Sequence, residues 1–206
     1  PIDKLFYQAR TEQLIHQAEI LSRTYTIAVT NPPYLNKYDA KLKTYVKTYY
    51  PDSKSDLFAV FMEVLLDHIV DGGYTGMINP DSWMFLTSYA KLRDKILISA
   101  HISTMYHLDY IFDDVVVHTT AFTINKGNLD GTIGDYIRLV DINNLDKKTL
   151  IASEASNDPI SERRFVATNA DFEVFPGKII AYWASDAMRK SFNKGLRLDP
   201  TFAHTN

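Results

Sequence analysis

Cysteine is absent from the 206 residues of this chain. Its absence excludes disulfide bonds, thiolate metal sites and a cysteine nucleophile, and it fits a reducing cytoplasm. Long apolar runs are missing as well, because no stretch reaches the roughly 18 residues that indicate a membrane span. The N-terminal residues show no signal-peptide pattern. We therefore expect a soluble, cytoplasmic protein that makes no contact with a membrane.

A surplus of basic charge is also missing, because 22 Lys and Arg residues stand against 25 Asp and Glu residues, for a net charge of −3. Bulk charge gives no support for nucleic-acid binding, which would need a local basic patch. The 6 histidines show no metal-ligand spacing and no Gly-x-Ser-x-Gly elbow occurs, so we exclude metallohydrolases and serine hydrolases. What the chain does have is 46% hydrophobic and 13% aromatic residues, enough for a substantial core.

The hydrophobic pattern predicts alternating helices and strands in the first half of the chain. Residues 3–23 are expected to form a helix, and residues 25–31 and 74–80 are expected to be buried strands. A helix capped by Ser55 lies between the two strands, and another follows near residues 88–99. This order predicts parallel strands joined by right-handed crossovers.

Two β-rich runs come next, at residues 102–112 and 115–126, with only Asp113 and Asp114 between them. Their spacing predicts an antiparallel pair, which we expect at the edge of the sheet. The pattern weakens after this pair. We place a boundary near residue 127 and expect a second module beyond it.

Asn31, Pro32, Pro33 and Tyr34 follow directly on the first predicted strand. Proline donates no ladder hydrogen bond, so the strand must end there. In an open α/β sheet, ligands bind beyond the carboxyl ends of the strands. There the Asn31 amide oxygen and a nearby backbone carbonyl give two acceptors, which suit an amino group with two N–H donors. Holding both hydrogens frees the nitrogen lone pair for attack on an electrophile, and Tyr34 offers a face for a planar base.

The Asn-Pro-Pro-Tyr motif at this position resembles the catalytic motif of S-adenosylmethionine-dependent N6-adenine DNA methyltransferases. Residues 55–83 are similar to the helix and strand that follow the motif in the group with a C-terminal recognition domain, and residues 111–124 resemble the later strand pair. The sequence FEVFPGKIIAYWAS, residues 172–185, resembles the large adenine methyltransferases of BREX-type phage-defence systems. The resemblance implies a base-flipping enzyme.

The resemblance also implies roles for individual residues. Asn31, Pro32, Pro33 and Tyr34 would be catalytic, with Tyr34 also stacking on the extruded base. Phe112 would pack against the other face of that base. A phenylalanine between two strands is as often a core residue, so that interpretation of Phe112 stays open.

The polar segment at residues 35–56 is basic in an otherwise acidic chain. Its lysines lie beside the expected base pocket, so we consider contacts to DNA phosphates and a merely solvated loop equally plausible. These lysines are Lys37, Lys41, Lys43, Lys47 and Lys54.

The fold that the resemblance implies is α/β, the C-terminal half of a Rossmann-like methyltransferase sheet. Parallel strands with helices would end in an antiparallel β-hairpin, followed by part of a second module. Residues 1–126 are then part of the catalytic domain, and residues 127–206 begin a target-recognition module.

In the resembling family, a glycine-containing cofactor loop precedes the catalytic motif. The 30 residues before Asn31 contain no strand with a glycine-rich turn. We therefore expect a fragment that lacks most of its S-adenosylmethionine site and is inactive alone. Asn31 is the candidate cofactor contact within the chain, and no metal is expected.

Three functions stay open. The leading one is methylation of adenine N6 in double-stranded DNA within a restriction-modification or phage-defence system. A protein-glutamine N-methyltransferase uses the same motif, and a non-catalytic DNA-binding or interaction remnant is the third. The basic segment and the residues after 127 favour DNA. We also expect other defence-system subunits as partners, and self-association of the fragment through an exposed sheet edge.

Overall fold

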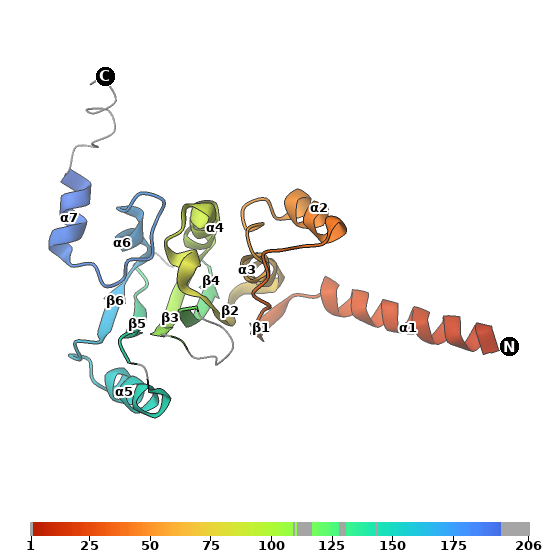
Figure 1. Ribbon diagram of the computed structural model, residues 1–206, viewed down its shortest axis with the longest axis horizontal. Helices are drawn as coiled ribbons and strands as arrows, with labels where there is room; N and C mark the ends of the chain where they lie inside the picture. The colour runs from red at the N-terminus through yellow and green to blue at the C-terminus, as the bar shows by residue number, and fades with distance from the viewer. Residues whose placement is uncertain (1, 109, 111–116, 128–130, 143, 195–206) are drawn as a thin grey trace, which may run out of the picture.

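The computed structural model describes residues 2–108, 110, 117–127, 131–142 and 144–194. Within these residues, the strands form one mixed sheet in the order β1-β2-β4-β3-β5-β6 (Figure 1). The strands are β1 (Tyr25–Thr30), β2 (Ile69–Pro80), β3 (Ala100–Leu108), β4 (Thr119–Lys126), β5 (Gly134–Leu139) and β6 (Arg164–Ala167).

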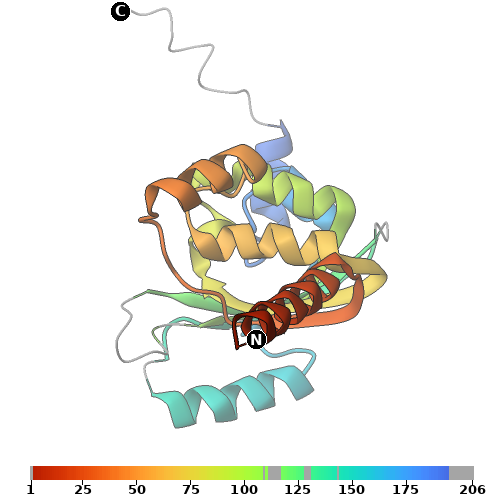
Figure 2. The same ribbon diagram turned by 90° about the vertical axis from the view of Figure 1, so that its right-hand side faces the viewer.

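Helices cover the two faces of this sheet unequally. Figure 2 shows α2, α3 and α4 on one side of the sheet and α5 on the other. Figure 1 shows α1 extending from β1 away from the sheet. The helices are α1 (Ile2–Ser22), α2 (Ala40–Tyr49), α3 (Leu57–His68), α4 (Ala90–Ser99), α5 (Leu145–Asn157), α6 (Asn169–Glu173) and α7 (Asp186–Lys194), with short 3-10 turns at η1 (Asp81–Met84) and η2 (Thr87–Tyr89).

The parallel pair predicted from the sequence is present. β1 and β2 run parallel, with Thr30 beside Met77, and the connection between them contains α2 and α3. The predicted helix near residues 88–99 is α4, which buries Leu92 and Ile96 completely. Local periodicity therefore located α4 correctly, because this helix has one apolar face that packs on the core.

The predicted antiparallel pair is β3 and β4, but its place at the edge of the sheet was wrong. β4 lies between β2 and β3 and is antiparallel to both. β5 then adds parallel to β3, with Thr104 beside Asp135, and β6 adds antiparallel to β5. The pair is therefore central. β5 is covered on both of its faces: Tyr136 is buried on one face and Ile137 is buried on the other.

The sheet continues across the boundary that we placed near residue 127. β5, β6 and α5 all follow that residue and pack on the same sheet as β3. The interpretation of residues 127–206 as the beginning of a recognition module stays a prediction.

The main core lies between the sheet and the helices α3 and α4. It includes Phe58, Met77, Trp83, Met105 and Phe122, all almost completely buried. A smaller cluster, which includes Ile137, Leu139 and Ala155, lies between β5 and α5 on the opposite face. The carboxyl end of β2 is thus supported by a packed core on one face.

The β1 edge of the sheet is poorly covered. Ile27 and Val29 are 64% and 74% exposed. The expectation that residues 25–31 form a buried strand was therefore wrong, since β1 is an outermost strand of the sheet. Leu5, Leu14 and Leu21 on α1 are exposed as well. Among the described residues, no helix combines the length and the apolarity that crossing a membrane requires.

Candidate active site at the carboxyl ends of β1 and β2

The Asn-Pro-Pro-Tyr motif lies where the sequence predicted, at the end of a strand. β1 ends at Thr30, Asn31 is exposed, and Pro32 is buried. Because β1 and β2 are parallel, their carboxyl ends lie side by side. Asn31 is thus held at the edge where α/β sheets bind ligands.

An open hollow of about 380 Å³ adjoins Asn31. Residues of four neighbouring strands line it, among them Val29, Ile78, Ala121 and Tyr106. Tyr106 also contacts Ser156 of α5 through their hydroxyl groups, 2.9 Å apart, so the hollow lies on the face of the sheet that carries α5. Its lining is mostly apolar, and Asn31 is the polar side chain at the end of β1.

Tyr34 is fixed to the neighbouring strand. Its hydroxyl donates a hydrogen bond of 3.0 Å to the carbonyl oxygen of Ile78 on β2, and its ring meets Phe58 edge-on, with centroids 6.2 Å apart. Burial raises the pKa of Tyr34 to about 12, so the hydroxyl stays protonated at neutral pH. The ring therefore has a defined orientation next to Asn31.

Asp56 fixes the backbone that follows Tyr34. One carboxylate oxygen accepts 2.9 Å from the Leu35 amide and 3.3 Å from the Phe58 amide, and the Leu57 amide donates 2.9 Å to the Leu35 carbonyl. Burial raises the pKa of Asp56, and the amide donors act in the opposite direction. Asp56 thus joins the motif loop to the first turn of α3.

This role of Asp56 was not predicted from the sequence. Ser55 was expected to cap α3, which is wrong, because Asp56 is the residue that caps the helix. The signal was present: an aspartate immediately before an apolar helical run is a preferred N-cap. Its second bond, to Leu35, has no sequence signal because 21 residues separate the two.

The basic segment at residues 35–56 is not a loop along its whole length, because it contains the helix α2. Asp39 caps α2 by accepting from the amides of Lys41 and Leu42 at 2.8 and 2.9 Å. All five candidate lysines are exposed, and none is within ion-pair distance of a described carboxylate. Lys41, Lys43 and Lys47 are on α2, with Lys37 before it and Lys54 after it. Their role in phosphate contacts stays a prediction.

Phe112, the second predicted stacking residue, lies outside the described residues. Its place relative to Tyr34 therefore stays a prediction.

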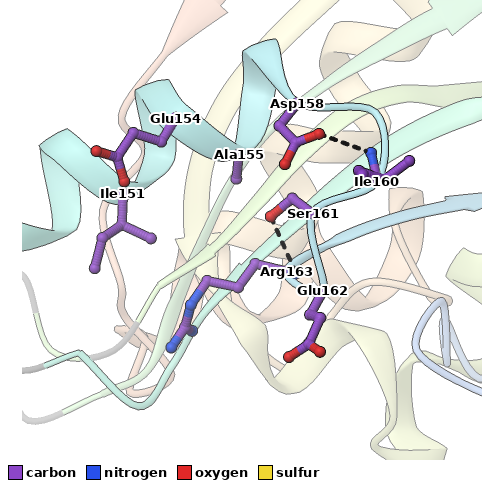
Figure 3. A pocket seen from close by; sticks show the side chains of 8 residues that line it. All are labelled: Ile151, Glu154, Ala155, Asp158, Ile160, Ser161, Glu162 and Arg163. Carbon is purple, nitrogen blue, oxygen red and sulfur yellow. Dashed lines mark hydrogen bonds between the residues drawn. The ribbon is translucent and has the colours of Figure 1, made fainter.

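A second hollow, of about 520 Å³, lies between α5 and the turn before β6 (Figure 3). Three carboxylates line it, those of Glu154, Asp158 and Glu162. The guanidinium of Arg163 donates two hydrogen bonds, of 2.7 and 2.8 Å, to Asp141. The surroundings are acidic and β5 and β6 lie at the opposite end of the strand order from β1, so this hollow does not contribute to the site at Asn31.

The fold and the site together define a class of protein. A sheet in which antiparallel β4 separates parallel β2 from β3, with Asn-Pro-Pro-Tyr ending β1, is the arrangement of a Rossmann-like methyltransferase. A sequence model of the Eco57I restriction-modification methylase family matches residues 3–112, and the chain belongs to this family.

Two curated relatives are similar over most of the chain. The chain is 42% identical over 189 residues to the adenine-specific methyltransferase PglX of Lacticaseibacillus casei (strain Zhang). It is 37% identical over 186 residues to the adenine-specific methyltransferase BrxX of Escherichia coli O9:H4 (strain HS). The matches cover 89% and 87% of this chain, but only 16% and 15% of the relatives. The resemblance to adenine methyltransferases of phage-defence systems is thus confirmed.

A solved structure shares the fold. The methyltransferase subunit of a type I restriction-modification system from Streptococcus thermophilus matches with a TM-score of 0.57 at 17% identity. The match covers 77% of this chain and 37% of that chain. The expected α/β methyltransferase sheet is therefore confirmed.

Proposed function

We propose that this chain is the part of a longer adenine-specific DNA methyltransferase that carries the catalytic motif. The whole protein transfers a methyl group from S-adenosylmethionine to N6 of an adenine flipped out of duplex DNA, within a restriction-modification or phage-defence system. The observation that carries the proposal is the Asn-Pro-Pro-Tyr motif held at the carboxyl end of β1, with Tyr34 anchored on β2. The names of the two relatives support adenine as the base.

Asn31 has the chemistry to hold the target amino group. Its side-chain oxygen and a neighbouring backbone carbonyl accept the two N–H bonds of N6. This draws the nitrogen away from planar conjugation and makes its lone pair available for bond formation to carbon. The proton that N6 then loses passes to solvent, so the site needs no strong base.

The cofactor fits this site only in part. S-adenosylmethionine supplies an electrophilic methyl group on a positively charged sulfur. Asn31, exposed at the end of β1, is the candidate contact among the described residues. Among the described residues, the glycines with positive φ angles are Gly72, Gly127, Gly131 and Gly177, and none of them lies in the turn directly after β1. The larger part of the cofactor site would be supplied by residues outside the described chain.

Tyr34 acts through its ring. Its hydroxyl is engaged with the Ile78 carbonyl, and a pKa of about 12 makes the group a poor acid at neutral pH. A ring with a fixed orientation stacks on an extruded base at a smaller entropy cost than a mobile ring does. We assign Tyr34 to base stacking, with Phe112 as its partner on the other base face.

The five lysines would contact phosphates. They are exposed and lie on α2 and its flanks, directly after the motif in sequence. Phosphate contacts position DNA without reading its sequence. Neutralising them would weaken binding equally for all sequences and reduce the salt dependence of binding.

The test is radiolabelled methyl transfer from S-adenosylmethionine to unmethylated genomic DNA by the full-length protein. We expect label on adenine, lost in Asn31→Ala and kept in the matched control Asn36→Ala, an exposed asparagine five positions on. The 206-residue chain is expected to transfer no label. Label on protein glutamine in place of adenine would reject the proposal.

A further inference from the structure

The segment at residues 174–185 has no regular secondary structure, yet it is part of the core. Ile180 is completely buried and Tyr182 is 1% exposed. The Ile180 amide donates 3.0 Å to the Met84 carbonyl, and the Arg93 guanidinium donates 2.9 Å to the Gly177 carbonyl. The segment is therefore fixed to α4 and to the η1 turn that follows β2.

A line of polar contacts runs from this segment to the carboxyl end of β2. The Tyr182 hydroxyl lies 2.9 Å from Nδ1 of His107, and Nε2 of His107 lies 3.2 Å from a carboxylate oxygen of Asp81. The neutral histidine tautomer with its proton on Nε2 satisfies both contacts: it donates to Asp81 and accepts from the tyrosine hydroxyl. Burial raises the pKa of Tyr182, which keeps that hydroxyl a donor.

Asp81 is also joined to the start of β4. Its backbone amide donates 2.9 Å to the His118 carbonyl, and its carboxylate lies 3.8 Å from Nδ1 of His118. Pro80, Thr119 and Leu108 are paired across β2, β4 and β3, so these contacts lie at the carboxyl end of β2. Asn31 lies at the carboxyl end of β1, the next strand along this edge.

The burial and packing of these side chains suit a positioning role. His107 and Asp81 are both largely buried, with side chains 6% and 14% exposed. The Tyr182 ring stacks on Tyr136, with centroids 4.9 Å apart and planes 9° apart. Removal of the Tyr182 hydroxyl alone would therefore break the polar line without removing the aromatic packing.

We propose that Tyr182, His107 and Asp81 are positioning residues for the methyl-transfer site. They hold the η1 turn and the start of β4 in a fixed place relative to Asn31. The segment that resembles the BREX-type enzymes is thereby connected, through these side-chain contacts, to the carboxyl ends of the strands, where Asn31 lies. The inference rests on the proposed function, because the geometry it maintains is that of the pocket for the flipped base.

The test uses the full-length protein with Tyr182→Phe, which keeps the ring. Tyr25→Phe is the matched control: its hydroxyl also donates a hydrogen bond, to the backbone carbonyl of Ile20, but it lies at the amino end of β1. We expect kcat for DNA methylation to fall about tenfold in Tyr182→Phe, with KM for S-adenosylmethionine unchanged, because a small misplacement of reacting groups is costly. Tyr25→Phe should match the wild type.

Conservative replacement separates positioning from folding. Asp81→Asn keeps an oxygen that can accept a hydrogen bond from His107. We expect it to retain more methylation activity than Asp81→Ala, although the two variants have the same melting temperature. A purely structural role predicts activity losses that follow stability in all these variants.

Hydrogen exchange provides a readout that does not depend on activity. The Asp81 amide, bonded to His118, should exchange several-fold faster in Tyr182→Phe than in the wild type or in Tyr25→Phe. Unchanged exchange at Asp81 together with wild-type kinetics would overturn the inference. Lack of DNA methylation by the wild-type protein would instead overturn the proposed function, so the two failures give different signals.

Discussion

Two regions of the chain, α1 with β1 and the segment at residues 172–185, contrast in pattern and in packing. The N-terminal region, α1 and β1, is regular in structure, yet its apolar side chains are exposed, with Leu21 68% and Val29 74% exposed. In the segment at residues 172–185, only the last two residues of α6 have regular structure, yet Phe172 and Ile180 are completely buried. Sequence periodicity reports local structure, whereas burial depends on which surfaces the rest of the fold supplies.

The contrast has an energetic meaning. Complete burial of a large apolar side chain stabilises a protein by about 1.5–3 kcal/mol relative to its exposure. Residues 172–185 therefore contribute to the stability of the sheet although they contain little regular structure. α1 and the β1 edge contribute little of this kind, because their apolar surface still faces solvent.

The largest effect is expected from the buried end. Phe172→Ala removes a completely buried ring and should lower the free energy of unfolding by about 3–5 kcal/mol. The matched change at the other end, Val29→Ala, should alter it by less than about 0.5 kcal/mol. Urea unfolding of the 206-residue chain measures both. Equal losses in the two variants would contradict the difference in packing between the two regions.

Arg93 gives the next largest effect. Its guanidinium donates to the carbonyls of Gly177, Trp83 and Leu86 at 2.9, 2.8 and 2.8 Å, so Arg93→Met leaves three acceptors unpaired. We expect a loss of about 1–3 kcal/mol or more. Lys91→Met on the same helix is the control, because its side chain is 82% exposed and should cost about 0–1 kcal/mol. Similar unfolding midpoints for the two variants would contradict the role of Arg93.

The exposed edge should govern association rather than stability. Val29→Lys places a charge on the β1 edge and should reduce self-association of the 206-residue chain, because charged edge strands resist pairing with other chains. Sedimentation velocity over a range of concentrations measures the change. A wild-type chain that stays monomeric throughout would show that this edge does not pair.

The smallest effect concerns pH. Hydrogen bonds from Arg163 lower the pKa of Asp141 to about 2, from 3.8 in the unfolded chain. A depressed carboxyl pKa stabilises the fold above the unfolded value, and this stabilisation is lost as pH falls from about 4 to about 2. Asp141 is largely exposed, so the effect is about 0–1 kcal/mol. The unfolding midpoints of the wild type and Asp141→Asn should differ slightly at neutral pH and converge near pH 2; a constant difference would contradict this.

The sequence predicted the parts of this fold that depend on neighbouring residues. It located β1, α4 and the motif at the strand end, because apolar periodicity and the two prolines are local signals. It did not place β4 between β2 and β3, since strand order depends on pairing between distant residues. The contact between His107 and Tyr182, 75 residues apart, had no local signal either. Phe112 stays a prediction on the resemblance alone.

The separation of Asn31 and Tyr182 in the sequence has a consequence for biosynthesis. The ribosome makes Asn31 before Tyr182, and the Tyr182 contact to His107 forms only after residue 182 has left the exit tunnel. At usual translation speeds this delay is on the order of ten seconds. Throughout that interval the nascent chain contains the Asn-Pro-Pro-Tyr motif but not the contact between Tyr182 and His107. A message truncated before the codon for residue 182 therefore encodes the motif but not the tyrosine that contacts His107.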